Sequence, residues 1–189
     1  MFLPHWLKLT ALSRALAFGS LALGLLAICS CSKAPTTDIK TQVAADETVK
    51  FSGYKSYSWF AGVGMVRDDT GKWDDGDLDI TAELKFLIDR TLRDRGLNEA
   101  TSTPDLFIGF LIVADVNQLK EITDRGGKVS SIEGAGEAAL VIELIDAKTE
   151  RTVWVGVASA DAQTGRSNDE VKARLDYAVT ELFKGLPKD

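Results

Sequence analysis

The chain has 189 residues, enough for one domain, and its 45% hydrophobic and 26% charged residues are typical of a globular protein. The formal net charge is −6, and residues 1–30 hold two bases and no acid, so the rest of the chain carries 20 bases against 28 acids. An acidic body of this kind disfavours nucleic-acid binding, because phosphate contacts need clustered Lys and Arg side chains.

Histidine and cysteine are confined to the start of the chain. The single histidine is His5, and the only cysteines are Cys29 and Cys31. Residues 32–189 therefore contain no histidine and no thiol. This excludes Ser-His and Cys-His catalysis, zinc sites of His or Cys type, haem ligation by histidine and disulfides within the domain. We expect a noncatalytic protein without a cofactor.

Residues 1–30 have the features of a secretory signal peptide. Lys8 and Arg14 make a basic start, and the apolar run of residues 15–28 follows. As a helix rising 1.5 Å per residue, this run would cover about 21 Å, which is short of the roughly 30 Å hydrocarbon core of a bilayer. An uncleaved membrane helix is therefore disfavoured.

The end of this run, Ile28-Cys29-Ser30-Cys31, resembles the lipobox of bacterial lipoproteins, in which an aliphatic and two small residues precede the acylated cysteine. We expect acylation of Cys31, because the small Ser30 precedes it. Cys29 is the alternative, but the larger Ile28 stands before it. The remaining possibility is an ordinary signal peptide cleaved elsewhere.

The lipobox resemblance implies several acyl chains on Cys31, which together hold a protein stably at a membrane. Ser32 follows Cys31, and a residue other than aspartate there resembles the signal for the Gram-negative outer membrane, facing the periplasm. Residues 31–47 are polar, with one proline and no sustained apolar period, so we expect a lipidated cysteine and a flexible tether. A single domain is expected over residues 48–189.

The first half of this domain is predicted to hold a strand, a loop and a helix. Residues 48–60 are rich in β-branched and aromatic side chains, which predicts a strand, broken or bulged near Gly53. Residues 61–76 are rich in Gly and Asp, which predicts a loop. Residues 79–95 predict an amphipathic helix that ends at Gly96. Its apolar stripe consists of Ile80, Leu84, Leu87, Ile88 and Thr91.

The second half is predicted to hold three strands and a helix. Residues 105–115 are apolar on both faces, as in a central strand, and a polar loop follows over residues 116–136. Residues 138–146 and 152–160 predict two strands joined by a hairpin turn. A capping box formed by Ser167 and Glu170 begins the last helix.

The predicted order is strand, helix, strand, strand, strand, helix. It indicates an α+β fold, a two-layer sandwich in which two helices pack on one four-stranded sheet. The sheet would be mostly antiparallel, or mixed if the first helix makes a right-handed crossover between parallel strands.

Four segments, in this order, resemble the domain-of-unknown-function family 4136, which is found in bacterial lipoproteins. They are FSGYKSYSW at 51–59, PDLFI at 104–108, LVIELID at 140–146 and VWVG at 153–156. The likeness covers residues 48–187. It implies this fold and a lipoprotein, and it supplies no site residues, because the family has no established activity.

Asp75, Asp77 and Asp79 occupy alternate positions and match the first half of an EF-hand calcium loop. The match is partial, because Ile80 stands where that loop needs glycine and Phe86 where it needs a bidentate glutamate. The alternative interpretation is an acidic loop that caps the following helix.

The large aromatic side chains are candidates for a groove that takes an apolar or peptide ligand, namely Tyr54, Tyr57, Trp59, Phe86 and Trp154. Core packing is the alternative for them. Two functions follow. The first is a noncatalytic binding or structural module, held at the membrane through Cys31, with an envelope protein or lipid as partner. The second is a carrier of a lipid or other apolar ligand between sheet and helices.

Overall fold

The computed structural model describes residues 36–60, 65–67, 77–113, 138–161 and 165–188. The chain divides into two units, Met1–Ser32 and Lys33–Asp189, and the described residues all belong to the second. The expected cleavage and acylation site and the predicted loop at 116–136 lie outside the described residues.

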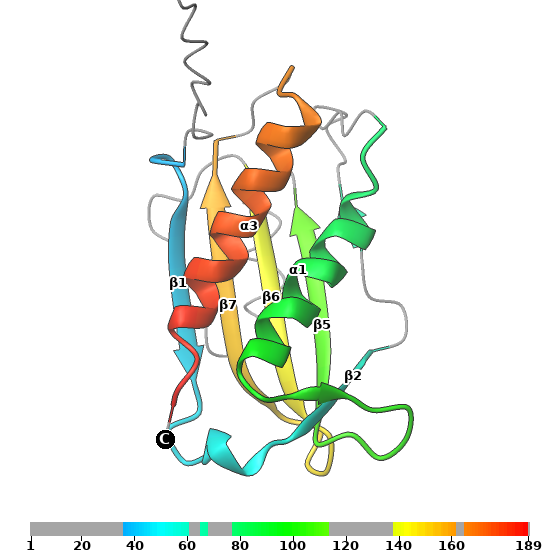
Figure 1. The fold of residues 1–189 in the computed structure, drawn as a ribbon. Coiled ribbons are helices and arrows are strands. Elements are labelled where there is room, and N and C mark those ends of the chain that lie inside the picture. Colours follow the sequence, from blue (N-terminus) through cyan, green and yellow to red (C-terminus); the bar gives the residue numbers. More distant parts are fainter. Residues whose placement is uncertain (1–35, 61–64, 68–76, 114–137, 162–164, 189) are drawn as a thin grey trace, which may run out of the picture. The chain divides into compact units, whose positions relative to one another are not determined.

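The second unit is an α+β fold in which α1 and α3 cover one face of a mixed sheet (Figure 1). The described strands follow the order β1-β7-β6-β5-β2-β4, and β3 also pairs with β5. The pairs from β1 to β5 along this order are antiparallel, whereas β2 and β3 run parallel to β5. The strands are β1 (Lys40–Ala45), β2 (Ser56–Trp59), β3 (Met65–Arg67), β4 (Asn98–Glu99), β5 (Leu106–Val113), β6 (Ala138–Asp146) and β7 (Thr152–Ala160).

The α+β prediction is confirmed, and the prediction of a four-stranded sheet is wrong, because the described residues form seven strands. β3 and β4 were not predicted from the sequence, because strands of three and two residues are too short to show an alternation of apolar and polar side chains. The strand predicted over 48–60 is also shorter than expected. A 3-10 helix, η1 (Phe51–Gly53), precedes β2.

Helix α1 (Ile80–Asp94) begins and ends as the sequence predicts. The Asp79 side chain accepts a hydrogen bond from the Ala82 amide and so caps the first turn. At the other end Gly96 has a φ of 83°, and the Leu97 amide donates to the Leu92 carbonyl. The buried stripe consists of Ile80, Leu84, Leu87, Ile88 and Leu92, so Leu92 takes the place of the predicted Thr91, which is half-buried.

Helix α3 (Asn168–Lys184) opens with the predicted capping box, in which Ser167 and Glu170 each bond to the other's backbone amide. Its apolar stripe is buried against the sheet and consists of Ala178, Val179, Leu182 and Phe183. Neither of the two described helices is long and apolar enough to cross a bilayer.

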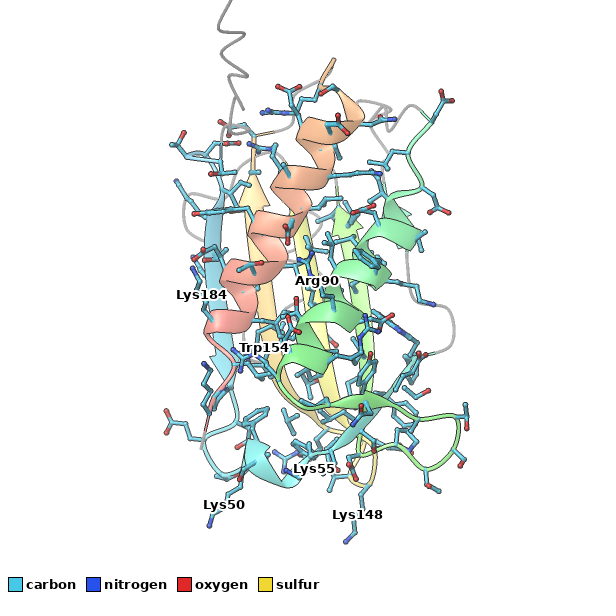
Figure 2. The ribbon with its side chains drawn as sticks, in the orientation of Figure 1. Lys50, Lys55, Arg90, Lys148, Trp154 and Lys184 are labelled. Carbon is cyan, nitrogen blue, oxygen red and sulfur yellow. The ribbon has the colours of Figure 1, made fainter. Side chains whose placement is uncertain are left out.

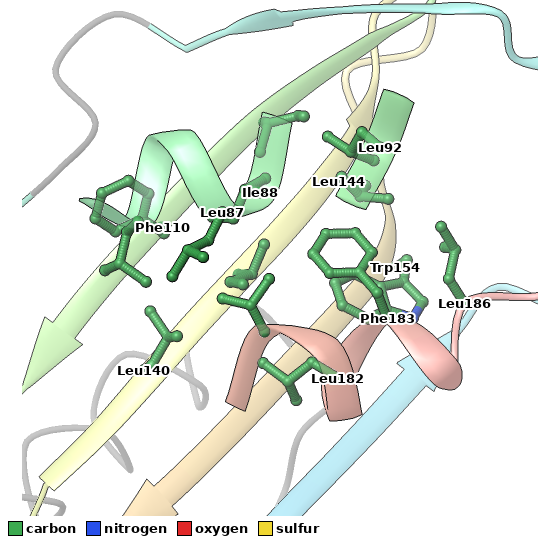
Figure 3. Packing of buried hydrophobic residues seen from close by; sticks show 14 of the residues in the cluster. Leu87, Ile88, Leu92, Phe110, Leu140, Leu144, Trp154, Leu182, Phe183 and Leu186 are labelled. Carbon is green, nitrogen blue, oxygen red and sulfur yellow. The ribbon is translucent and has the colours of Figure 1, made fainter. Parts of the chain in front are cut away.

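The core between sheet and helices is centred on Trp154 of β7 (Figure 3). Its ring stacks on Phe183 with centroids 5.2 Å apart and planes at 22°. Gly156 leaves room for this ring, because a Cβ there would lie 2.5 Å from the Trp154 Cη2 atom. Only 1% of Trp154 is exposed, and its indole N–H has no acceptor among the described residues.

The segment predicted to be a flexible tether contributes an edge strand instead. Residues 40–45 form β1, which pairs with β7 from Lys40 opposite Ser159 to Ala45 opposite Trp154. The expectation of a flexible tether up to residue 47 is therefore wrong for this stretch. Its polar composition misled the prediction, because most of β1 faces solvent, as an edge strand can.

Two contacts hold β1 to α3. Arg174 donates two hydrogen bonds to the Asp38 carboxylate, at 2.8 and 2.6 Å, and only 9% of the Arg174 side chain is exposed. Farther along, Val43 packs so closely on Gly185 that a Cβ at this glycine would lie 2.5 Å from a Val43 methyl group. Because Asp38 lies before β1 and is bound to α3, the folded domain includes residues that precede β1.

The sheet face opposite the helices carries a second apolar cluster around Val113, Ala139, Val141 and Val157, all buried. Glu143 of β6 lies on this face, opposite Gly109 of β5 and Val155 of β7. Its carboxyl group makes no hydrogen bond or ion pair with the residues that the structure describes. Burial raises the pKa of its carboxyl group.

The variant Asp38→Asn should lower the free energy of unfolding at pH 7 by about 1–3 kcal/mol, because it weakens a charge-assisted bidentate contact. The hydrogen bond from Arg174 holds the pKa of Asp38 below its usual value of 3.8. The pair therefore stabilises the fold above that value, and its contribution is lost as the pH falls through the lowered pKa. Denaturant unfolding at pH 7 and at pH 3 measures both effects.

The matched control is Glu181→Gln, which removes the more exposed pair between Lys184 and Glu181 and should change stability by less than about 0.5 kcal/mol. Equal stabilities of Asp38→Asn and the wild-type protein at pH 7 would contradict the stabilising role of the Asp38–Arg174 pair.

The variant Glu143→Gln should raise the melting temperature at pH 7, because it removes a charge that the sheet face disfavours. The raised pKa means that the folded state favours the protonated carboxyl. Stability is therefore greatest below the unfolded pKa and falls as the pH rises through the folded one. The gain from the variant should vanish near pH 3, where wild-type Glu143 is already neutral. Thermal melts from pH 3 to pH 8 measure this, with the exposed Glu47→Gln as the control that leaves the profile unchanged.

Candidate functional site

The structure does not bring the five predicted groove residues together on one surface. Trp154 and Tyr57 are 1% and 0% exposed and belong to the core, which corrects the expectation for these two. Phe86 is 55% exposed on the solvent side of α1. Tyr54 and Trp59 are half-buried at different places beside the core. Large aromatic residues alone did not distinguish groove from core, because both environments favour them.

Tyr57 and Trp59 tie β2 to α1 through one carboxylate. The Tyr57 hydroxyl and the Trp59 indole N–H both donate to Asp89, at 2.8 and 3.1 Å. Burial and the bond to Asp89 raise the pKa of Tyr57 above its usual value of 10.0, so the phenol stays neutral. The Lys85 ammonium lies 5.1 Å from the centre of the Trp59 ring. This network fixes the helix on the sheet and offers no nucleophile.

Tyr54 and two further carboxylates fix the loops at the opposite end of the sheet from the start of β1. The Tyr54 hydroxyl donates to Asp146 at 2.8 Å. Asp105 accepts hydrogen bonds from the backbone amides of Lys55 and Ser56, and also from the Ser56 hydroxyl. These bonds hold the pKa of Asp105 below its usual value of 3.8. The carboxylates are structural, because each is engaged in positioning a turn.

The predicted calcium loop is only partly described. Asp79 caps α1, Asp77 is exposed, and Asp75 lies outside the described residues. In the part of the chain that the structure describes, no three or more His, Cys, Asp or Glu residues gather where they could hold a metal ion. Asp79 thus acts in the way the alternative interpretation predicts.

The candidate site is a pocket of about 640 Å³, here called the helix-end pocket, where the C-terminal ends of α1 and α3 meet η1. Its volume lies within the usual range for small-molecule sites. Side chains of three separate segments line it, among them Lys55, Arg90 and Lys184, which are labelled in Figure 2. The apolar floor consists of Phe51, Tyr54, Leu97, Leu106, Phe183 and Leu186.

The rim of the helix-end pocket carries Lys55, Arg90, Arg95, Lys184 and Lys188, with Asp94 as its acid. Two of these five bases are neutralised by partners, since Arg90 pairs with Asp176 and Lys184 with Glu181. Lys55, Arg95 and Lys188 form no ion pair with described residues. The rim is therefore net positive in a chain whose body is acidic.

Arg95 is the central cation of this rim. Its guanidinium donates to the carbonyl oxygens of Phe183 and Leu186, at the end of α3, where the helix dipole is negative. Burial lowers the pKa of this guanidinium, since part of its hydration is lost without a carboxylate to replace it.

Sequence reasoning missed the helix-end pocket. The short run Arg90, Arg93 and Arg95 gave a signal, but acids at 89 and 94 concealed it. Lys55 and Lys188 lie far away along the chain, and only the fold brings them to the rim. The lining residues include one carboxylate, that of Asp94, and no histidine.

Solved structures of similar fold include a DUF4136 family protein from Bacteroides thetaiotaomicron. Its TM-score is 0.58 at 12% identity, over 79% of this chain and 96% of that one. A PDZ domain protein from Parabacteroides distasonis gives 0.45 at 15% identity, over 80% and 36% of the two chains. A PelC dodecamer from Paraburkholderia phytofirmans gives 0.46 at 10% identity, over 80% and 99%. The first of these supports the fold alone. Among curated proteins, none matches this chain.

The family profile described as "Domain of unknown function (DUF4136)" matches residues 41–188. The match begins inside β1 and runs past the end of α3, so it spans the sheet, both helices and the helix-end pocket. The chain belongs to the DUF4136 family.

Proposed function

We propose that this protein is a noncatalytic binding or structural module, held by acyl chains on Cys31 at the periplasmic face of the outer membrane. The observation that carries the proposal is the apolar run that ends in Ile28-Cys29-Ser30-Cys31. Because the run is short for a membrane span and ends at a small residue before a cysteine, cleavage and acylation explain it best.

A noncatalytic role is supported by what the body contains. Beyond Cys31 the sequence has neither histidine nor cysteine. Several carboxylates of the described residues already serve the fold, since Asp38, Asp89 and Asp105 each accept bonds that join two segments of the chain. A hydrolase built on carboxylates would need two of them converging in one cleft, and the helix-end pocket is lined by the single acid Asp94.

The proposed tether is shorter than the sequence predicted, because the folded domain already includes Asp38. Six residues lie between Cys31 and Asp38, so an extended chain of seven residue steps reaches at most about 25 Å. The end of the sheet where β1 begins would thus lie near the membrane. β1 runs from this end toward η1 (Figure 1), and the helix-end pocket would face away from the bilayer, toward the periplasm.

The second candidate function is carriage of an apolar ligand. Among the described residues, the space between sheet and helices is filled by core side chains such as Trp154, Phe183 and Leu144 (Figure 3). A ligand between the layers would have to displace them. The helix-end pocket, with its apolar floor, is the place in the described structure that favours such a role.

Substitution of Cys31 by serine should abolish metabolic labelling with an alkyne fatty acid, because the acylated side chain is lost. The wild-type protein should be labelled, and its intact mass should equal residues 31–189 plus several acyl chains. In-gel fluorescence and intact-mass spectrometry measure these results.

The matched control is Cys29→Ser. Because residue 29 lies in the leader that is removed, this variant should change neither the labelling nor the mass of the mature protein. Labelling that persists in Cys31→Ser and disappears in Cys29→Ser would move the anchor to Cys29. Absence of labelling in the wild-type protein would overturn the proposal.

A further inference from the structure

The net charge of the residues that line the helix-end pocket is positive, whereas the net charge of the protein is negative. The body carries 20 bases against 28 acids, whereas five bases and the acid Asp94 line this pocket. When the pairs of Arg90 with Asp176 and of Lys184 with Glu181 are set aside, Lys55, Arg95 and Lys188 still outnumber Asp94. Positive charge concentrated at a concave surface attracts anions.

Arg95 has hydrogen-bonding capacity left over. A guanidinium carries five N–H groups, and the described structure uses one on Phe183 and one on Leu186 through the two terminal nitrogens. These acceptors are neutral carbonyls. The remaining N–H groups of a half-buried cation on the pocket wall can therefore donate to a carboxylate or phosphate, which are the acceptors that match guanidinium geometry.

The floor of the pocket is apolar and held in place by the core. Leu106 and Phe183 are 1% exposed, so core packing fixes both side chains and they support the floor from beneath, with little of their own surface open to a ligand. Phe51 and Tyr54 form an edge-to-face pair with ring centroids 5.9 Å apart. The bond from the Tyr54 hydroxyl to Asp146 fixes this ring in the lining of the pocket.

We propose that the helix-end pocket binds a small amphiphilic anion, whose carboxylate or phosphate head lies against Arg95, Lys55 and Lys188 and whose apolar body lies on the floor. The inference rests on the proposed binding role, and only the side from which the ligand comes depends on the anchor. The pocket lies at the end of the sheet remote from the start of β1, so the ligand would come from the aqueous side.

The test uses the full acylated protein in phosphatidylcholine nanodiscs, with 1-naphthyl phosphate as the probe and isothermal titration calorimetry as the measurement. Empty nanodiscs provide the blank. We expect saturable binding at one site and binding of inorganic phosphate at least tenfold weaker, because inorganic phosphate has no apolar body.

The variant Lys55→Met with Lys188→Met should weaken binding of 1-naphthyl phosphate about tenfold, because methionine keeps an apolar stem and removes the charge. The matched control is Lys50→Met with Lys148→Met, which removes the same charge from two exposed lysines that do not line the pocket (Figure 2). The control should bind within twofold of the wild-type protein. Equal melting temperatures of the two double variants exclude a folding defect.

Several results would overturn the inference. The first is absence of saturable binding by the wild-type protein, and the second is equal weakening by both double variants, which would show attraction to surface charge alone. Equal affinity for inorganic phosphate would remove the role of the apolar floor. Loss of probe binding when the nanodiscs contain phosphatidylglycerol would indicate that a lipid headgroup, and not a soluble anion, occupies the pocket. If the protein is acylated but fails to bind the probe, this inference alone is contradicted. If the purified protein carries no acyl chains, the proposed anchor is contradicted instead.

Discussion

The bidentate ion pair between Arg174 and Asp38 decides where the folded domain begins. It joins the residues before β1 to α3, with little of either side chain exposed. From there β1 pairs along its whole length with β7 and leads to η1, whose residues form part of the helix-end pocket. An N-terminal strand held in this way makes the proposed tether short and places the pocket at the far end of the domain.

The helix-end pocket is a consequence of how the two helices pack. Both helices cover one face of the sheet over the core around Trp154, and their C-terminal ends converge beside η1. The end of α3 leaves carbonyl groups that need donors, and Arg95 from the end of α1 supplies them. The same guanidinium thus stabilises the meeting point of the helices and gives the pocket its charge.

The helices were predictable because their signals are local: a stripe at 3.6-residue spacing in α1, and the Ser167–Glu170 capping box in α3. The strands β5, β6 and β7 were predictable from long apolar runs. β1 was not, because it is a mostly exposed edge strand, and Arg174, which binds Asp38 just before it, lies 136 residues away. The helix-end pocket was not predictable either, since Lys55, Arg95 and Lys188 meet only in the fold, and aromatic residues mark core and groove alike.

The most direct measurement of the central claim is native-state hydrogen exchange of residues 38–47 in the full acylated protein, followed by mass spectrometry. If β1 belongs to the folded domain, its amides that bond to β7 should exchange with nearly the protection of those between β6 and β7, and far more slowly than in an unstructured peptide. Exchange of residues 40–45 at the rate of an unstructured peptide would contradict the account. The tether would then extend to residue 47, and the proposed orientation of the helix-end pocket would have no support.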